Sequence, residues 1–167
     1  MDPTQLRELQ APIKERYRDD PGAALITLEA DGTLDDGISC SVDTGRALVR
    51  AGLHPGTGGD ASLACSGDML LEALAACAGV TMRSVATAMG LQVSGSIHAE
   101  GDLDWRGTLG IDRDVPVGFK SIRLRFDLKS DASEEELAAL QEKTERYCVV
   151  LQSLASSPQL SVSMQQS

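Results

Sequence analysis

Hydrophobic residues recur at helical spacing in four stretches of the chain. This spacing predicts helices over residues 3–17, 66–90, 134–147 and 151–154. Asp2 and Pro3 suit the cap and first turn of the first helix, which we expect Pro12 to kink or split. Ser133, followed three residues later by Glu136, forms a capping box that predicts the start of the third.

Apolar and polar residues alternate in five other stretches, as in half-buried strands. The alternation predicts strands over residues 24–29, 37–42, 92–100, 121–129 and 159–164. Turn residues join the first two into a predicted hairpin, and residues 101–119 are expected to add strand and turn. Since strands and helices do not follow a regular βαβ order, the predicted class is α+β with antiparallel sheets.

The most apolar run, Met69–Met82, is shorter than the roughly 20 residues that span a bilayer and contains Glu72. It predicts a helix buried on all sides, and we expect no membrane partner. Leu70, Leu74, Cys77, Thr81 and Ser84 share one face of this helix.

Composition narrows the class of protein. The 167 residues suit a single domain, which we divide into a helical extension over residues 1–20 and a main unit over 21–167. The formal charge of −10 would repel a phosphate backbone, so nucleic acid is not an expected partner. The N-terminus lacks the apolar run of a signal peptide, which predicts a cytoplasmic protein.

The four cysteines, Cys40, Cys65, Cys77 and Cys148, form no CxxC pair, and the chain has only two histidines. We therefore expect no metal site and no cofactor. From the residues alone, Cys77 and Cys148 are either packed thiols or reactive ones. Cys148 lies where the first N–H groups of a new helix would stabilise a thiolate.

Two segments resemble the OsmC/Ohr family. The stretch from Ser66 to Met82, preceded by Gly58–Gly59, resembles the family's central helix, and residues 145–150 resemble its second cysteine segment. The resemblance covers about residues 24–165. It implies an α+β fold with antiparallel sheets wrapped around long central helices in an intertwined homodimer, whose active sites draw on both chains.

The resemblance also implies a thiol peroxidase that prefers organic hydroperoxides. Cys77 would attack the peroxide, Cys148 would resolve the sulfenic acid, and a small dithiol such as dihydrolipoamide, or a thioredoxin-like donor, would reduce the disulfide. Cys40 and Cys65 match no family position and are assigned to packing.

Two positions depart from the family pattern. The family's Pro-Glu-Glu, in which a glutamate orients the arginine that activates the thiol, is replaced by Ser66–Gly67–Asp68, so that Asp68 becomes the substitute. The second cysteine is followed by Val149 instead of proline. Arg46 and Arg50 are the nearest choices for the arginine, although both could equally be solvated.

Three further residues are expected to contact substrate: His54, Leu74 and Tyr147. For His54 the competing interpretation is an exposed loop residue. Two other functions remain open: a non-catalytic member of the fold that binds a small molecule at the dimer interface, and a hydrolase with Cys77 as nucleophile. The second requires a neighbouring base, and neither histidine lies in a segment that predicts a Cys–His pair.

Overall fold

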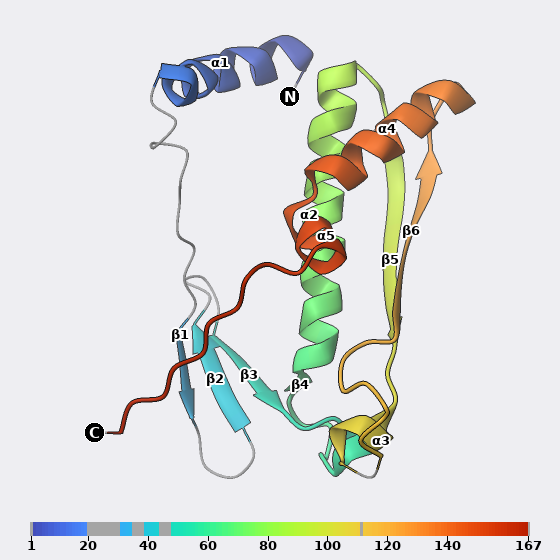
Figure 1. Cartoon of the computed structure of the whole chain (residues 1–167). Coiled ribbons are helices and arrows are strands. Elements are labelled where there is room, and N and C mark those ends of the chain that lie inside the picture. Colours follow the sequence, from blue (N-terminus) through green and yellow to red (C-terminus); the bar gives the residue numbers. More distant parts are fainter. Residues whose placement is uncertain (1, 20–30, 35–38, 44–47, 111, 167) are drawn as a thin grey trace.

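The computed structural model describes residues 2–19, 31–34, 39–43, 48–110 and 112–166 (Figure 1). The helices are α1 (Pro3–Asp19), α2 (Ser66–Met89), α3 (Trp105–Thr108), α4 (Glu134–Tyr147) and α5 (Val149–Ala155), with a 3-10 turn at Pro55–Thr57. The strands are β1 (Asp31–Leu34), β2 (Ser39–Asp43), β3 (Leu48–Gly52), β4 (Ala64–Cys65), β5 (Ser94–Asp102) and β6 (Ser121–Lys129).

The strands form two sheets, in agreement with the α+β prediction. One has the order β1-β2-β3-β4 and the other is the antiparallel pair β5-β6. The expectation of purely antiparallel sheets is wrong at one place, because β3 and β4 are parallel. Residues 31–34, which the sequence analysis assigned to the connection between the first two predicted strands, form β1, and β3 was not predicted. The predicted strand over 24–29 lies outside the described residues.

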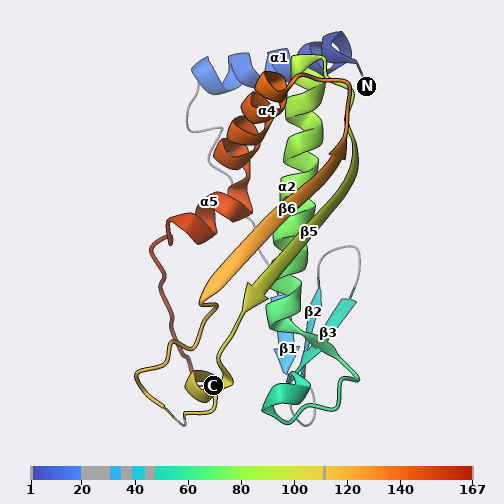
Figure 2. The same cartoon turned by 90° about the vertical axis from the view of Figure 1, so that its right-hand side faces the viewer.

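Helix α2 is the element on which the rest of the described fold packs. Its predicted ends are confirmed: Asp68 lies in the first turn, and Gly90 closes the helix with a left-handed φ of 74°. Helices α4 and α5 pack against one side of α2, and the β5-β6 hairpin runs along another (Figures 1 and 2). This arrangement places the middle of α2 opposite the α4–α5 junction.

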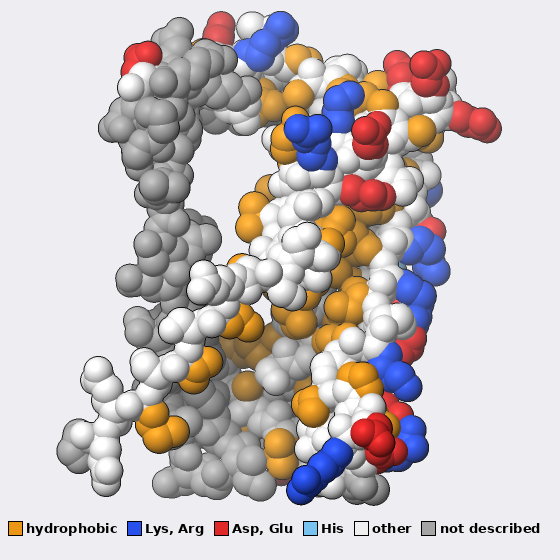
Figure 3. All heavy atoms as spheres, viewed as in Figure 1, with side chains coloured by type: hydrophobic (Ala, Val, Ile, Leu, Met, Phe, Trp, Pro, Cys, Tyr) orange, Lys and Arg blue, Asp and Glu red, His pale blue; other side chains and the backbone are white. Residues whose placement is uncertain are grey.

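The prediction that α2 is covered on all sides is wrong for the single chain. Only a stripe at four-residue spacing is buried, namely Leu74, Ala78, Met82 and Ala86. Val80 is 73% exposed, and hydrophobic side chains are visible over α2 in Figure 3. By length and hydropathy α2 could also cross a membrane, a test that core helices of soluble proteins pass as well.

Helices α4 and α5 meet at Cys148. The capping box at Ser133 and Glu136 is formed as predicted and opens α4, which ends at Tyr147. Leu140 has no exposed surface and joins Met82, Ala86 and Val93 in the core. Cys148 is both the last cap of α4 and the first of α5. Packing of α4 against α2 therefore fixes the position of the second cysteine.

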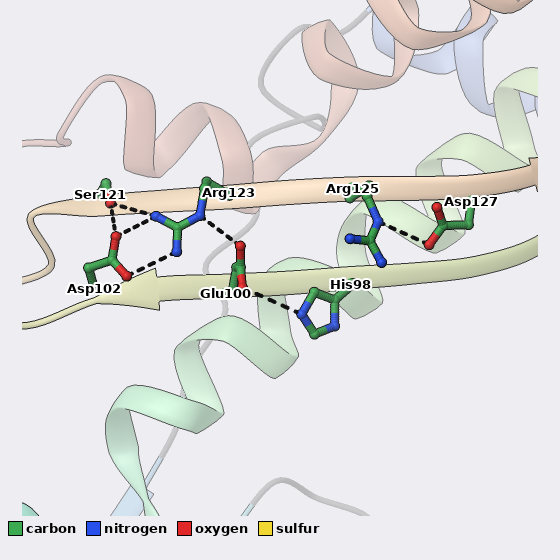
Figure 4. Close-up of polar contacts among 7 residues, drawn as sticks. All are labelled: His98, Glu100, Asp102, Ser121, Arg123, Arg125 and Asp127. Carbon is green, nitrogen blue, oxygen red and sulfur yellow. Dashed lines mark hydrogen bonds and ion pairs between the residues drawn. The ribbon is translucent and has the colours of Figure 1, made fainter.

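The outer face of the β5-β6 hairpin carries a ladder of charges (Figures 3 and 4). Arg123 lies opposite Glu100 in the strand register, donates to its carboxylate over 2.7 Å, and also donates to Asp102. Hydrogen bonds from Arg123 lower the pKa of both carboxyl groups. His98 lies 3.8 Å from the other Glu100 oxygen. The hairpin thus turns its charges to solvent and its apolar side chains to α2.

Both ends of the chain differ in part from expectation. Helix α1 contains Pro12 but is not split there, and the Asp2 side chain caps it by accepting from Thr4 and Gln5. The predicted closing strand over 159–164 is not formed. Its apolar side chains, Leu160, Val162 and Met164, are at least 82% exposed, because no described strand pairs with this segment. Between β5 and β6, residues 105–108 form α3 instead of strand.

Candidate functional site

The structure brings the two predicted cysteines together. Cys77 lies in the middle of α2 and is partly buried, whereas Cys148 lies at the α4–α5 junction and has no exposed surface. The two thiols lie close enough for each to shift the pKa of the other. Both are free thiols in the structure.

Several hydrogen-bond donors converge on the sulfur of Cys77. Burial raises the pKa of Cys77, but hydrogen bonds from the Val150 amide, the Cys148 thiol, the Val149 amide and the Thr81 hydroxyl together outweigh it. The pKa of Cys77 therefore lies below its ordinary value. Since the thiolate is the nucleophile, this arrangement favours a reactive Cys77.

The two amides are those that the start of α5 leaves unsatisfied. The N-cap side chain, Cys148, makes no capping hydrogen bond. The Val149 and Val150 amides in the first turn of α5 lower the pKa of Cys77, so the N-terminus of α5 stabilises the thiolate of a residue on α2. These amides lie near the Cys77 sulfur only because α5 packs against α2.

Cys148 titrates in the opposite direction. Burial raises its pKa, and this effect, together with the negative charge that develops on Cys77, outweighs the hydrogen bond from the Leu151 amide. The amides of Leu151 and Val150 in α5 do lower the pKa of Cys148, as the sequence led us to expect, but burial and Cys77 outweigh them, so the expected activation of Cys148 is corrected. The first proton to leave the pair comes from Cys77.

A shallow hollow of about 410 Å³ opens beside Cys148. Tyr147, a predicted substrate contact, is 60% exposed in its wall. The Arg146 guanidinium stacks 5.7 Å from the centre of the Tyr147 ring. The remaining lining residues are Val149, Gln152, Ser153 and Ser156.

Among the other predicted activating residues, Asp68 is not brought to the Cys77 of its own chain. Asp68 lies in the first turn of α2, about 13 Å before Cys77 along the axis at 1.5 Å per residue, so its carboxylate does not reach the thiol of its own chain. Arg50 lies on β3, which leads through the 3-10 turn to β4 and the start of α2. Arg46 falls outside the described residues.

His54 lies in a second hollow, at the start of α2. Its ring stacks on Trp105 with centroids 5.0 Å apart, and its Nδ1 accepts a 2.9 Å hydrogen bond from the Gly56 amide. The hollow, about 220 Å³, also contains Cys65 and Asp68. His54 is therefore held in place by its own loop and lies at the Cys65 end of α2.

Leu74, the third predicted substrate contact, is fully buried on the core stripe of α2. A role for it in binding substrate stays a prediction. A larger groove of about 890 Å³ runs between β6 and the α4–α5 pair, with Leu124, Phe126, Leu137 and Leu151 in its wall. Among the described residues, no three His, Cys, Asp or Glu side chains are grouped so that they could hold a metal ion.

The model of the family described as OsmC-like protein matches residues 59–163, more than half of the chain. The chain belongs to the OsmC-like family. The match includes both cysteines of the site and most of the described fold. No curated protein matches the sequence significantly.

Solved structures show the same fold. An OsmC-like protein from Mycoplasma pneumoniae aligns over 79% of this chain and 89% of its own, with a TM-score of 0.68 and 18% identity. An organic hydroperoxide resistance protein OsmC from Legionella pneumophila aligns over 79% and 91%, with a TM-score of 0.57 and 19% identity. An OsmC-like protein of unknown function from Vibrio cholerae gives a TM-score of 0.63 at 13% identity, over 77% and 94%. At these identities the likeness shows the fold alone.

Sequence reasoning did not predict the donors to Cys77. The Thr81 hydroxyl could have been found from its position four residues after Cys77 on a predicted helix, where the two side chains are neighbours. The Val149 and Val150 amides could not, because they reach Cys77 only through the packing of α5 on α2.

Proposed function

We propose that the protein is a thiol-dependent peroxidase that reduces organic hydroperoxides. The observation that carries this proposal is the contact between Cys77 and Cys148, in which Cys77 has the lowered pKa and Cys148 the raised one. The thiol with the lower pKa is suited to attack a peroxide, and the thiol with the higher pKa is suited to resolve the resulting sulfenic acid.

The chemistry balances with these two thiols and an external dithiol. The Cys77 thiolate attacks the peroxide, the O–O bond breaks, and the products are a sulfenic acid on Cys77 and an alkoxide that takes a proton from water. The Cys148 thiol then condenses with the sulfenic acid, forming a disulfide and releasing water. A dithiol reduces the disulfide and becomes oxidised itself.

The burial of the two sulfurs indicates how the reductant would approach. Cys148 has no exposed surface, whereas Cys77 is partly exposed, so a dithiol reaches the Cys77 sulfur of the disulfide first. Cys148 is then the leaving thiolate, at the N-terminus of α5, whose positive end stabilises a negative charge. Dihydrolipoamide or a thioredoxin-like protein would serve as donor, in a reducing cytoplasm.

A homodimer is part of the proposal. The uncovered apolar side of α2, with Val80 73% exposed, supports a second copy packed against it. Since Asp68 and Cys77 of one chain are too far apart, an Asp68 that acts on Cys77 would belong to the partner chain. Light scattering on the eluted protein is expected to give a dimer, and a monomer at micromolar concentration would contradict this part.

The test is peroxide consumption with a dithiol reductant. Cumene hydroperoxide and hydrogen peroxide are offered to the full chain, to Cys77→Ser and to Cys65→Ser. We expect the full chain and Cys65→Ser to consume the organic peroxide and Cys77→Ser not to. If the unmodified protein consumes neither peroxide, the proposal fails.

A specific observation favours one alternative. The groove between β6 and the α4–α5 pair is largely apolar and is big enough for a small ligand, which fits a non-catalytic binding protein of the same fold. The stretch Ser66–Gly67–Asp68, which stands in place of the family's Pro-Glu-Glu and lacks its glutamates, points the same way. A protein without peroxidase activity that still binds an apolar fluorescent probe would favour this alternative.

A further inference from the structure

A cavity of about 370 Å³ lies between α2 and the β5-β6 hairpin, which runs along this side of the helix (Figure 2). It contains neither cysteine of the candidate site. The side chains of its wall are mostly apolar, namely Met82, Val93, Ile97 and Leu128. Among the described residues, Arg83 is the one charged residue that lines it. A largely apolar cavity with a single charged group is typical of a site for a small molecule.

The Arg83 guanidinium is held in place by one hydrogen bond. Its Nη1 donates to the carbonyl of Val93 over 2.6 Å, which ties α2 to the residue before β5. This bond leaves Nε and Nη2, a pair of donors that matches the two oxygens of a carboxylate. In the described part of the chain, Nε and Nη2 of Arg83 have no acceptor. An oriented pair of donors is therefore available to a ligand at this cavity.

Other arginines of the chain show what such a pair of donors binds. Nε and Nη2 of Arg106 donate to the two carboxylate oxygens of Asp104, over 3.0 and 2.6 Å. The same two atoms of Arg123 also donate to carboxylates, on the outer face of the hairpin (Figure 4). Arg83 differs because no carboxylate of the described chain reaches it. Its pair of donors therefore suits a carboxylate from outside the chain.

The wall of the cavity is bare backbone at two glycines. A Cβ at Gly79 on α2 would lie 2.7 Å from Cδ1 of Ile97, closer than real Cβ atoms approach a neighbour. At Gly95, where φ is +138°, a Cβ would overlap the carbonyl of Asp127. Both glycines line the cavity, so a side chain at either position would disturb its wall.

We propose that this cavity binds a small molecule that carries one carboxylate on an apolar chain. Nε and Nη2 of Arg83 would donate to the carboxylate, and the apolar wall would contact the chain. Arg83 is exposed, so the bound carboxylate keeps its contact with water, whereas the apolar chain is removed from water. The proposal goes beyond the peroxidase function and does not depend on it.

A second copy of the chain is the competing partner for the guanidinium. Arg83 lies one turn after Val80, near the side of α2 on which we propose that a second copy packs. An acidic side chain of that copy would also match the donors of Arg83. The cavity favours the small molecule, because it offers apolar space next to the guanidinium for the rest of the ligand.

The test is a titration of the full chain, labelled with ¹⁵N, with octanoate and with octan-1-ol, followed by NMR. The two probes have the same chain length, and only octanoate has a charge. We expect octanoate to bind at least about tenfold more tightly, because charged hydrogen bonds are the stronger ones. The amide signals of Gly79 and residues 93–97 should shift. At 0.15 M salt the formal charge of −10 on the chain is screened beyond about 8 Å.

Arg83→Met removes the guanidinium and keeps an unbranched side chain. It should weaken the binding of octanoate by about tenfold and leave that of octan-1-ol within about twofold. Arg113→Met is the matched control, because Arg113 is exposed and does not line the cavity, and it should leave both within about twofold. If Arg83→Met does not fold, as judged by circular dichroism, Arg83→Lys is measured. Lysine keeps the charge without the paired donors, so octanoate should bind about threefold more weakly or worse.

Three results would overturn the proposal. The first is equal binding of the two probes, or no saturable binding of octanoate. The second is a set of shifts confined to the groove between β6 and the α4–α5 pair, which Arg83 does not line. The third is an Arg83→Met protein that is monomeric, when the parent is a dimer that binds no octanoate, which would assign the guanidinium to the second copy. None of these results depends on peroxide consumption, so this proposal and the proposed function fail separately.

Discussion

Two cysteines lie along α2 in different surroundings. Cys65 caps the start of the helix and lies in a hollow with His54 and Trp105. Cys77 lies in the middle, where a second thiol, two backbone amides and a hydroxyl lower its pKa although burial raises it. The His54 imidazole beside Cys65 is a residue type that often activates a thiol. In the described chain, however, only Cys77 has a second thiol and amide groups that lower its pKa. The comparison teaches that packing against α5, more than nearby polar residue types, distinguishes the reactive thiol.

The largest expected effect on peroxide consumption comes from replacing each of the two cysteines by serine in turn. Cys77→Ser should lower peroxide consumption by about a hundredfold or more, because it removes the nucleophile, while Cys65→Ser should leave it within about twofold. The rates are measured with cumene hydroperoxide in excess dithiol. Equal losses in the two variants would remove the distinction between the two surroundings.

Loss of the resolving thiol should have a different signature. In Cys148→Ser the Cys77 sulfenic acid has no neighbouring thiol, so it should persist and then advance to the sulfinic and sulfonic acids. Mass spectrometry after graded additions of peroxide detects these forms. A Cys148→Ser protein that resists over-oxidation as well as the parent does would show that another group resolves Cys77.

The packing of α4 against α2, which positions Cys148, should also contribute to the stability of the fold. Leu140 has no exposed surface, so Leu140→Ala should lower the free energy of unfolding by about 2–5 kcal/mol. Leu109, which is 51% exposed, is the control, and Leu109→Ala should change it by about 0.5 kcal/mol or less. Urea denaturation measures both. A similar loss in the two variants would contradict the described core.

The smallest effect is expected far from both cysteines. Arg123→Ala should lower the melting temperature slightly, and less than Leu140→Ala does, because its ion pairs are exposed. Arg123 lowers the pKa of Glu100 and Asp102, so the stability it adds is present above the ordinary carboxyl pKa of about 4 and is lost as the pH falls further.

Thermal melts at pH 7 and pH 3 check this sign. The difference between Arg123→Ala and the parent protein should shrink at the lower pH. Arg125→Ala is the control, because Arg125 donates only to Asp127, over 3.1 Å, among the contacts described for it. A difference that grows in acid would contradict the assignment of these pairs.

Local signals in the sequence predicted the elements that carry the site. Asp68 and Gly90 gave the ends of α2, Ser133 and Glu136 gave the start of α4, and alternation gave β6. The missed features depend on contacts between distant segments. The short strand β3 exists through its pairing with β2 and β4, and the segment containing Leu160 lacks a strand because nothing described pairs with it.

The candidate site, like the fold, was predicted only in part from the sequence. The resemblance to the family selected Cys77 and Cys148, but the order of their pKa values depends on burial and on amide directions, which only the packed helices define. Asp68, expected to help activate the thiol, and His54, expected to contact substrate, lie at the start of α2. The distance of Asp68 from Cys77 follows from the predicted helix over 66–90, whereas the position of His54 depends on how its loop stacks on Trp105.

The most direct test of the central claim is to map disulfides after one equivalent of cumene hydroperoxide. The reduced protein is oxidised, remaining thiols are blocked, and the peptides are identified by mass spectrometry without reduction. We predict one major linked pair, containing Cys77 and Cys148, with Cys65 recovered as a blocked thiol. A disulfide that contains Cys65, or a Cys77 recovered blocked and unoxidised, would contradict the account.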